Sequence, residues 1–258
     1  MNIFSYESRF SQVFLKLSYA CCLNTLWFIC CLPIVTIGAS YAGLYRVMFK
    51  TMRSGGVTNP FKQFWIGFKT NFLQSTIVWV AYAALMVLLY FDVRICANAG
   101  PPISFFQYGA YAVALILTLV LIYTFPSIAA FEGKIKEHIR NAIYFSFHKP
   151  WFIPVNLFFH IFPLYLTYSD PHLLPLYAFC WFFFGFGAIV MLTARLLIKD
   201  YNKYLPLVDD FGDFILTEDG KMIMPGTPEE KAYFASQNPS GGEKTEAEIL
   251  EEMKMLDM

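Results

Sequence analysis

Three polar side chains inside otherwise apolar segments could bind a ligand: Asn24, Asn156 and His160. Asn156 and His160 are four residues apart, so they share a face of any helix that contains both. Polar groups inside a membrane segment point into a helix bundle or a wet cavity, where an amide and an imidazole could bind a hydroxyl-rich solute. The competing interpretation is helix–helix hydrogen bonding, worth about 0.6 kcal/mol per pair on average. We favour this second interpretation for all three residues.

The sequence contains no catalytic motif and no metal-binding set. Two adjacent cysteine pairs, Cys21–Cys22 and Cys30–Cys31, have a spacing that could suit a metal, but no histidine or carboxylate nearby completes a ligand set. Small apolar thiols also pack well between helices. The nucleophile elbow Gly-x-Ser-x-Gly, the zinc helix His-Glu-x-x-His and the phosphate-binding glycine loop are all absent. We therefore expect no enzymatic activity, no cofactor and no bound metal.

The segments that carry these residues are typical of membrane helices. The chain is 57% hydrophobic and only 15% charged, whereas soluble domains average about 25% charged residues. Crossing the hydrocarbon core takes roughly 20 apolar residues in a helix. The sequence predicts an all-α, polytopic helical membrane bundle in residues 1–200 and a soluble tail in residues 201–258. About five spans are expected, near residues 17–36, 71–91, 104–126, 151–168 and 172–194.

The charges of the connections predict the orientation. Basic residues crowd the connections 46–69 and 127–149, whereas the connection 92–103 has one base and one acid. The positive-inside rule then places the two basic connections and the C-terminal tail in the cytoplasm. Five spans put the N-terminus outside. If residues 33–38 break the first apolar run into a hairpin, there are six segments and both ends lie inside.

An amphipathic helix is predicted between the first two spans, lying in the membrane interface. Its aromatic stripe and its lysines are Phe61, Phe64, Trp65, Phe68, Lys62 and Lys69. The lysines would contact anionic lipid headgroups. The basic residues alternate with apolar spans and form no continuous basic groove, so no nucleic-acid partner is expected. A span, a proline and an amphipathic helix occur twice, at Pro33 and at Pro126, which could mark a parallel internal repeat.

The tail carries signals of local structure. Residues 215–217 and 222–224 flank an Asp-Gly turn and predict a small hairpin. Thr227 and Pro228 predict the start of a helix, and Thr245 predicts a second, acidic helix near the C-terminus.

Two stretches of the chain resemble the YesL family of bacterial membrane proteins, classed as domain of unknown function 624. The first runs from Leu23-Asn24-Thr25-Leu26-Trp27 through Leu32-Pro33-Ile34-Val35 to Tyr45, and the second is Phe61 to Gln74. The resemblance implies a plasma-membrane protein encoded near carbohydrate ABC transporters and polysaccharide-degrading enzymes. It supplies no catalytic or ligand-binding residues.

Three hypotheses about function follow. The first is a non-enzymatic accessory protein of an oligosaccharide ABC uptake system, in contact with its permease subunits. The alternative is an independent small-solute transporter or channel that uses Asn156 and His160. A membrane enzyme ranks last, because no nucleophile–base pair is visible.

Overall fold

The computed structural model describes residues 9–54, 59–100, 102–208, 214–217 and 220–237. Over these residues the chain is a helical bundle with isolated β-bridges and no strand, which confirms the predicted class. The helices are α1 (Arg9–Cys30), α2 (Ile37–Arg53), α3 (Pro60–Thr70), α4 (Phe72–Asn98), α5 (Phe106–Ala130), α6 (Ile135–His148), α7 (Phe152–Ser169), α8 (Leu174–Cys180), α9 (Phe186–Tyr201) and α10 (Pro228–Gln237). Three 3₁₀ turns, η1 (Ile34–Thr36), η2 (Ile103–Phe105) and η3 (Pro171–Leu173), and a π-helix, η4 (Trp181–Gly185), lie between them.

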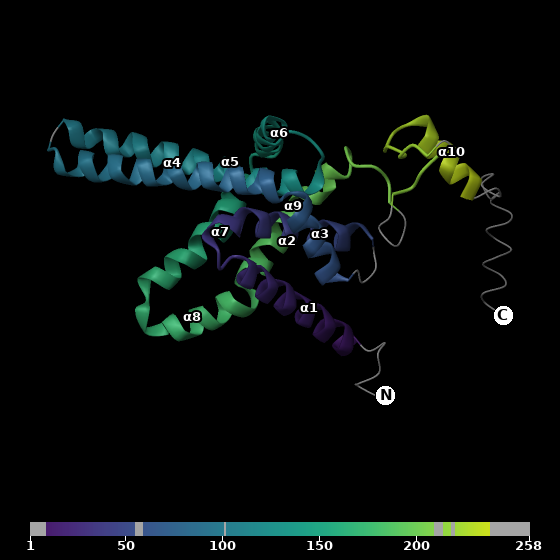
Figure 1. The fold of residues 1–258 in the computed structure, drawn as a ribbon, viewed down its shortest axis with the longest axis horizontal. Helices are drawn as coiled ribbons and strands as arrows, with labels where there is room; N and C mark the ends of the chain where they lie inside the picture. The colour runs from purple at the N-terminus through teal and green to yellow at the C-terminus, as the bar shows by residue number, and fades with distance from the viewer. Residues whose placement is uncertain (1–8, 55–58, 101, 209–213, 218–219, 238–258) are drawn as a thin grey trace.

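Four segments of the described chain are long and apolar enough to cross a membrane: Phe72–Asn98, Ile103–Ala130, Phe152–Ser169 and Pro171–Tyr201. They correspond to the second through fifth predicted spans. They form two helical hairpins, α4–α5 and α7–α8–α9, whose tips point away from the end of the molecule where the described chain begins and ends (Figure 1).

The first predicted span, 17–36, is not one helix. α1 ends at Cys30, and its apolar part, Ser18–Cys30, is shorter than the four candidate spans. Pro33 then precedes the single turn η1, and α2 runs back toward the end of the molecule where α1 begins (Figure 1). The structure therefore has the broken first run of the six-segment alternative, because Pro33 lacks the backbone N–H that would continue α1.

Helix α2 lies at the centre of the bundle. The sequence predicted a connection from residue 46 onward, but α2 continues to Arg53 with Leu44, Val47 and Phe49 fully or almost fully buried. It crosses α3 closely, since a Cβ on Gly67 would lie 3.0 Å from the Cα of Gly43. Small residues permit this approach, and it buries one side of both helices.

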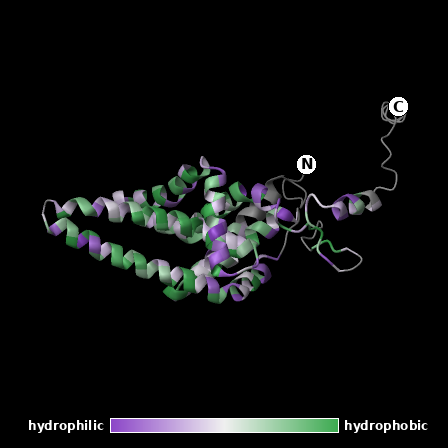
Figure 2. Cartoon of the chain, turned by 90° about the horizontal axis from the view of Figure 1, so that it is seen from above, coloured by the Kyte–Doolittle hydropathy of each residue, from purple (hydrophilic) through white to green (hydrophobic). Residues whose placement is uncertain are grey.

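Hydrophilic residues gather toward the end of the molecule that holds both ends of the described chain, while the long helices are mainly hydrophobic (Figure 2). The start of the tail packs onto this polar end. It forms a small hairpin in which Leu216 bridges Met222 and Gly220 has a φ of 75°. The predicted helix after Thr227 is α10, whereas the predicted helix after Thr245 lies outside the described residues.

Candidate polar site within the helix bundle

Asn24 is completely buried and bonds the π-helix between α8 and α9. Its Nδ2 donates to the backbone carbonyls of Trp181, at 2.8 Å, and Phe182, at 2.7 Å. Its Oδ1 accepts from the backbone N–H of Gly187 at 2.7 Å. A π-helix interrupts the regular helical hydrogen-bond ladder, so these polar groups need partners from outside the helix. Three hydrogen bonds use most of the bonding capacity of the Asn24 amide, so it is not free for a solute.

Asn156 lies in a cluster of five buried polar residues that we call the polar cluster: Tyr45, Tyr123, Asn156, Thr193 and Tyr201. They come from α2, α5, α7 and α9, and each is at most 1% exposed. The hydroxyl of Thr193 donates to Oδ1 of Asn156 at 2.9 Å. Tyr45 lies beside Thr193, and Tyr123 lies beside Asn156. The cluster therefore joins four helices at one buried point.

Three atoms of the polar cluster have no hydrogen-bond partner among the described residues: Nδ2 of Asn156 and the hydroxyls of Tyr123 and Tyr201. A buried polar group without a partner costs about 1–3 kcal/mol. A small molecule with two or more hydrogen-bonding groups, water being the smallest, would satisfy them. The five side chains are three phenols, an amide and an alcohol, so the cluster contains no carboxylate, amine or imidazole.

His160 does not join the polar cluster. Its Nδ1 donates to the backbone carbonyl of Asn156, one helical turn earlier, at 2.8 Å. The two residues share a helix, as the spacing predicted, but this bond ties the imidazole to its own backbone. A cavity of about 440 Å³ between α7, α8 and α9 has an apolar lining that includes Phe159, Pro163 and Trp181 but none of the three predicted ligand residues.

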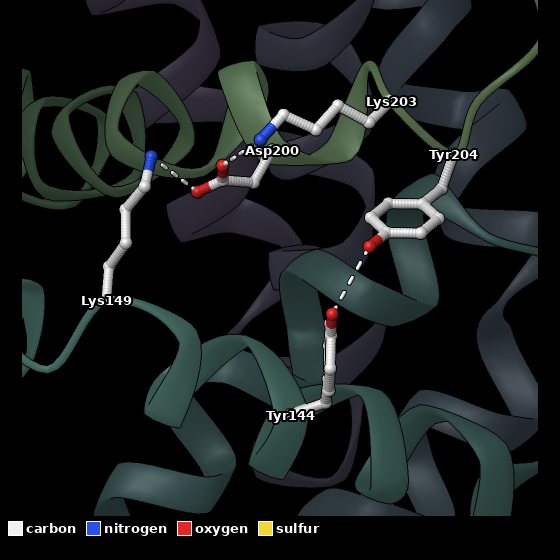
Figure 3. Close-up of polar contacts among 5 residues, drawn as sticks. All are labelled: Tyr144, Lys149, Asp200, Lys203 and Tyr204. Atoms are coloured by element: carbon white, nitrogen blue, oxygen red, sulfur yellow. Dashed lines mark hydrogen bonds and ion pairs between the residues drawn. The ribbon is translucent and has the colours of Figure 1, made fainter. Parts of the chain in front are cut away.

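An ion pair joins the end of α6 to the end of α9 (Figure 3). Nζ of Lys149 lies 2.8 Å from one carboxylate oxygen of Asp200, and Nζ of Lys203 lies 3.3 Å from the other. Next to them, the hydroxyls of Tyr144 and Tyr204 are 3.3 Å apart. Asp200 is 4% exposed, so water screens this carboxylate weakly. Lys149 caps α6 and Tyr144 lies on α6, so these contacts join the end of α6 to the end of α9.

The predicted interfacial residues lie on α3, but they do not share one environment. Phe64 is completely buried against α2, so it belongs to the core and cannot face lipid. Phe61 and Trp65 are about half exposed, and Lys62 is exposed beside them. Nζ of Lys69 lies 5.4 Å from the centroid of the Trp65 ring, within cation–π range, and the Phe68 ring stacks on that same Trp65 ring. The interfacial role of these exposed residues stays a prediction.

Sequence reasoning missed the three tyrosines of the polar cluster. Their signal was the position of a hydroxyl-bearing aromatic residue inside a buried stripe, as at Tyr45, but tyrosine is also common at membrane interfaces. In the described part of the chain, no group of three or more His, Cys, Asp or Glu side chains is arranged to hold a metal ion, and the six cysteines are free.

Comparison with known proteins finds a family that this chain resembles, but no activity. The family model described as protein of unknown function DUF624 matches residues 20–93, a segment that includes Asn24 and excludes Asn156 and His160. Three relatives from Bacillus subtilis (strain 168) are called uncharacterized proteins. YesL is 25% identical over 146 residues, which cover 55% of this chain and 68% of YesL. YesV is 26% identical over 176 residues, which cover 67% of this chain and 83% of YesV.

The third relative, YteU, is 21% identical over 141 residues, which cover 54% of this chain and 62% of YteU. No solved structure matches the chain. Together these matches support a member of the YesL family, as the sequence resemblance predicted.

Proposed function

We propose that this YesL-family protein is a multi-pass plasma-membrane protein without enzymatic activity, and that it acts as an accessory component of an oligosaccharide ABC uptake system. The link to sugar uptake comes from the family resemblance. The two long hairpins determine how the chain meets its surroundings.

The observation that carries the proposal is how little of the two hairpins packs against the rest of the chain. In the most apolar windows of α4 and α7, only 6% of the residues are buried. Exposed apolar side chains on α4 include Val87, Leu88 and Phe91, and the two hairpins diverge toward their tips (Figure 1). Helices with so little internal packing depend on lipid or on other membrane helices for contact. Permease helices would supply such contacts.

The charges support a cytoplasmic location for the polar end of the molecule, including the start of the tail. Arg46, Lys50 and Arg53 lie on α2 near this end, and Lys62 and Lys69 lie on α3. At the tip of the α4–α5 hairpin, Asp92 and Arg94 balance each other. The positive-inside rule favours the basic end as the cytoplasmic one.

The experiment is purification of the tagged full chain from its native membranes in a mild detergent, with quantitative mass spectrometry of the proteins that co-purify. We expect permease subunits of a sugar ABC transporter at a constant ratio to the chain. Recovery of the chain without any such subunit, under conditions in which known membrane complexes stay intact, would overturn the proposal. Capture of an unrelated protein would not support it.

Two matched variants test whether the hairpins make the contact. One truncates the exposed side chains Val87, Leu88 and Phe91 to alanine, and the other truncates Ile161, Leu164 and Tyr165 on α7. All six side chains are at least 40% exposed, so their removal leaves internal packing intact. Loss of the permease with one variant, at unchanged elution volume, identifies the docking hairpin. Retention with both variants would move the contact to another surface.

A second candidate function, an independent small-solute transporter, is favoured by the three unpartnered atoms of the polar cluster. Its test is uptake of labelled sugars by cells that carry the chain or the double variant Asn156→Ala, His160→Phe. Uptake that depends on the chain and falls in the variant would support a transporter. Unchanged uptake would remove both residues from the transport pathway.

A further inference from the structure

The turn between α1 and α2 exposes apolar side chains. Leu32 and Ile34 are each 72% exposed and Val35 is 54% exposed, although the turn belongs to a bundle whose core lies close by. No residue between Ser18 and Tyr45 is charged. A turn that faced water would leave most of the surface of these three apolar side chains in contact with solvent, which is unfavourable. The composition of the turn therefore fits an apolar surrounding.

Part of the backbone of the turn is hydrogen-bonded within the chain, which lowers the cost of placing the turn where no water can bond free groups. The Thr36 hydroxyl oxygen lies 2.6 Å from the carbonyl oxygen of Cys30 and 2.7 Å from that of Pro33, so its single proton is donated to one of them or shared between both. The backbone N–H of Cys31 donates to the carbonyl of Trp27. Pro33 itself has no N–H to satisfy. Thr36 thus closes the end of α1 with its own side chain.

Helix α4 shows how far the turn reaches. Nε1 of Trp79 donates to the carbonyl of Ile34 at 2.8 Å. Gly38, just after the turn, contacts α4 near Ser75, because a Cβ on Gly38 would lie 2.3 Å from the Ser75 carbonyl oxygen. Trp79 is seven residues after the start of α4 at Phe72, a rise of about 10 Å at 1.5 Å per residue. The hydrocarbon core is about 30 Å thick. The turn therefore stops well short of the far side.

Helix α2 gives an independent distance of similar size. Its first charged residue, Arg46, comes nine residues after Ile37 at the turn, which is about 14 Å along a helix. Arg46, Lys50 and Arg53 mark the level at which α2 reaches the polar end of the molecule. Both α2 and α4 place the turn about 10–14 Å from that level, which is less than half of the hydrocarbon thickness.

We propose that α1, η1 and α2 form a re-entrant hairpin, which enters and leaves the membrane on the side of the C-terminal tail, with Leu32, Ile34 and Val35 against lipid acyl chains inside that leaflet. The partner of this surface is the lipid itself. The inference rests on the proposed multi-pass arrangement of the long helices, and it assigns both ends of the chain to the same side. It differs from a six-span arrangement because neither arm of the hairpin crosses the membrane.

The test is cysteine labelling by a membrane-impermeant maleimide, applied to intact cells and to inverted vesicles. Val35→Cys is placed in the full chain with its six native cysteines replaced by alanine. We expect labelling from neither side and full labelling after denaturation in SDS. Labelling from the side opposite the tail would show that α1 crosses the membrane. Labelling from the tail side would show that the turn lies in water. Either result overturns the proposal.

Two control positions separate this proposal from the membrane arrangement on which it rests. Ala99→Cys, at the tip of the α4–α5 hairpin, is expected to react only from the side opposite the tail, and Lys62→Cys, exposed on α3, only from the tail side. If both controls react from one side, the multi-pass arrangement itself fails. A second measurement needs no cysteine replacement: epitope tags at the two ends of the native chain must become accessible on the same side, and tags on opposite sides contradict the re-entrant hairpin.

Discussion

The backbone N–H of Gly187 donates to the side-chain oxygen of Asn24 across 2.7 Å, and so joins two residues that are 163 positions apart. The same amide donates to two carbonyls of the π-helix that precedes Gly187. The first and last long helices of the bundle are therefore held together by one side chain. In an apolar surrounding, the three backbone groups have no water with which to replace it.

Replacement of Asn24 by alanine is expected to destabilise the protein by about 2 kcal/mol, because it leaves two carbonyls and one N–H without a partner. Thermal unfolding in detergent, followed by tryptophan fluorescence, measures this loss. Asn98→Ala is the matched control, since Asn98 donates to the carbonyl of Arg94 at an exposed position. Equal melting temperatures for the two variants would contradict a structural role for Asn24.

Asp200→Asn is expected to lower the free energy of unfolding by about 1 kcal/mol, discounted because Lys149 and Lys203 are partly exposed and screened by solvent. Lys149 has the shorter contact and the less exposed side chain, so Lys149→Met should cost more than Lys203→Met. A double-mutant cycle between Asp200→Asn and Lys149→Met isolates the coupling between those two side chains. A coupling of zero would show that the pair contributes nothing to stability.

Stability is expected to depend on pH through His138, which lies on α6 outside the candidate spans. Burial lowers the pKa of His138 below its usual value, although bonds to Gly133 and Ser127 and the charge of Glu137 act in the opposite direction. The unfolded chain therefore binds a proton more readily than the folded one. The stabilisation is complete above a pH of about 6.5 and declines as the pH falls from there toward the lower folded pKa.

Unfolding midpoints of the wild type and of His138→Gln, measured between pH 7.5 and pH 5 in the same detergent, check this direction. The wild type should lose more stability than the variant over that interval. A wild type that gains stability relative to His138→Gln on acidification would contradict the sign.

The lysines of α3 are expected to recruit anionic lipid. Each lysine near a negatively charged membrane surface contributes about 1 kcal/mol, and Lys62 and Lys69 are both exposed on this helix. The double variant Lys62→Gln, Lys69→Gln should carry a lower fraction of anionic lipid when purified, as measured by lipid mass spectrometry. Lys231→Gln on α10 serves as the control with one exposed lysine removed from a different element. Unchanged lipid composition in the double variant would refute the interfacial role of α3.

Hydropathy was sufficient to predict the four long segments, because a run of about 20 uncharged residues has few alternatives to a spanning helix. It failed for residues 17–53, because the hydropathy of an apolar side chain is the same whether lipid or protein covers it. Pro33 ends a helix, yet Pro126 lies inside α5, which continues to Ala130. The two halves of the suspected repeat therefore differ where the sequence made them look alike, and the first half has α2 as an additional buried helix.

The candidate site was predictable in part for a related reason. A buried amide such as Asn156 needs a partner, which the sequence indicated, but the identity of that partner depends on which helices meet. Its partner, Thr193, is 37 residues away along the chain. From the sequence alone, any hydroxyl on a facing helix could have filled that place. The tyrosines of the polar cluster were missed because their rings fit a hydrophobic stripe and their hydroxyls leave no pattern in the sequence.

The contact between Gly38 and α4 yields the sharpest test of how the α1–α2 turn is held. A methyl group on Gly38 would lie 2.3 Å from the carbonyl oxygen of Ser75 and 2.8 Å from Cβ of Trp79, so α2 and α4 would have to separate. Gly38→Ala is therefore expected to destabilise the protein by about 1–3 kcal/mol, the range for overpacking a tight contact.

Gly109→Ala is the matched control, because a Cβ on Gly109 in α5 meets no atom within 4 Å, and alanine favours a helix over glycine by roughly 0.5–1 kcal/mol. The two substitutions add the same methyl group to a helical glycine and should shift the unfolding midpoint in opposite directions. If Gly38→Ala raised the midpoint as Gly109→Ala does, the turn would not be packed against α4, and the depth inferred from Trp79 would lose its basis.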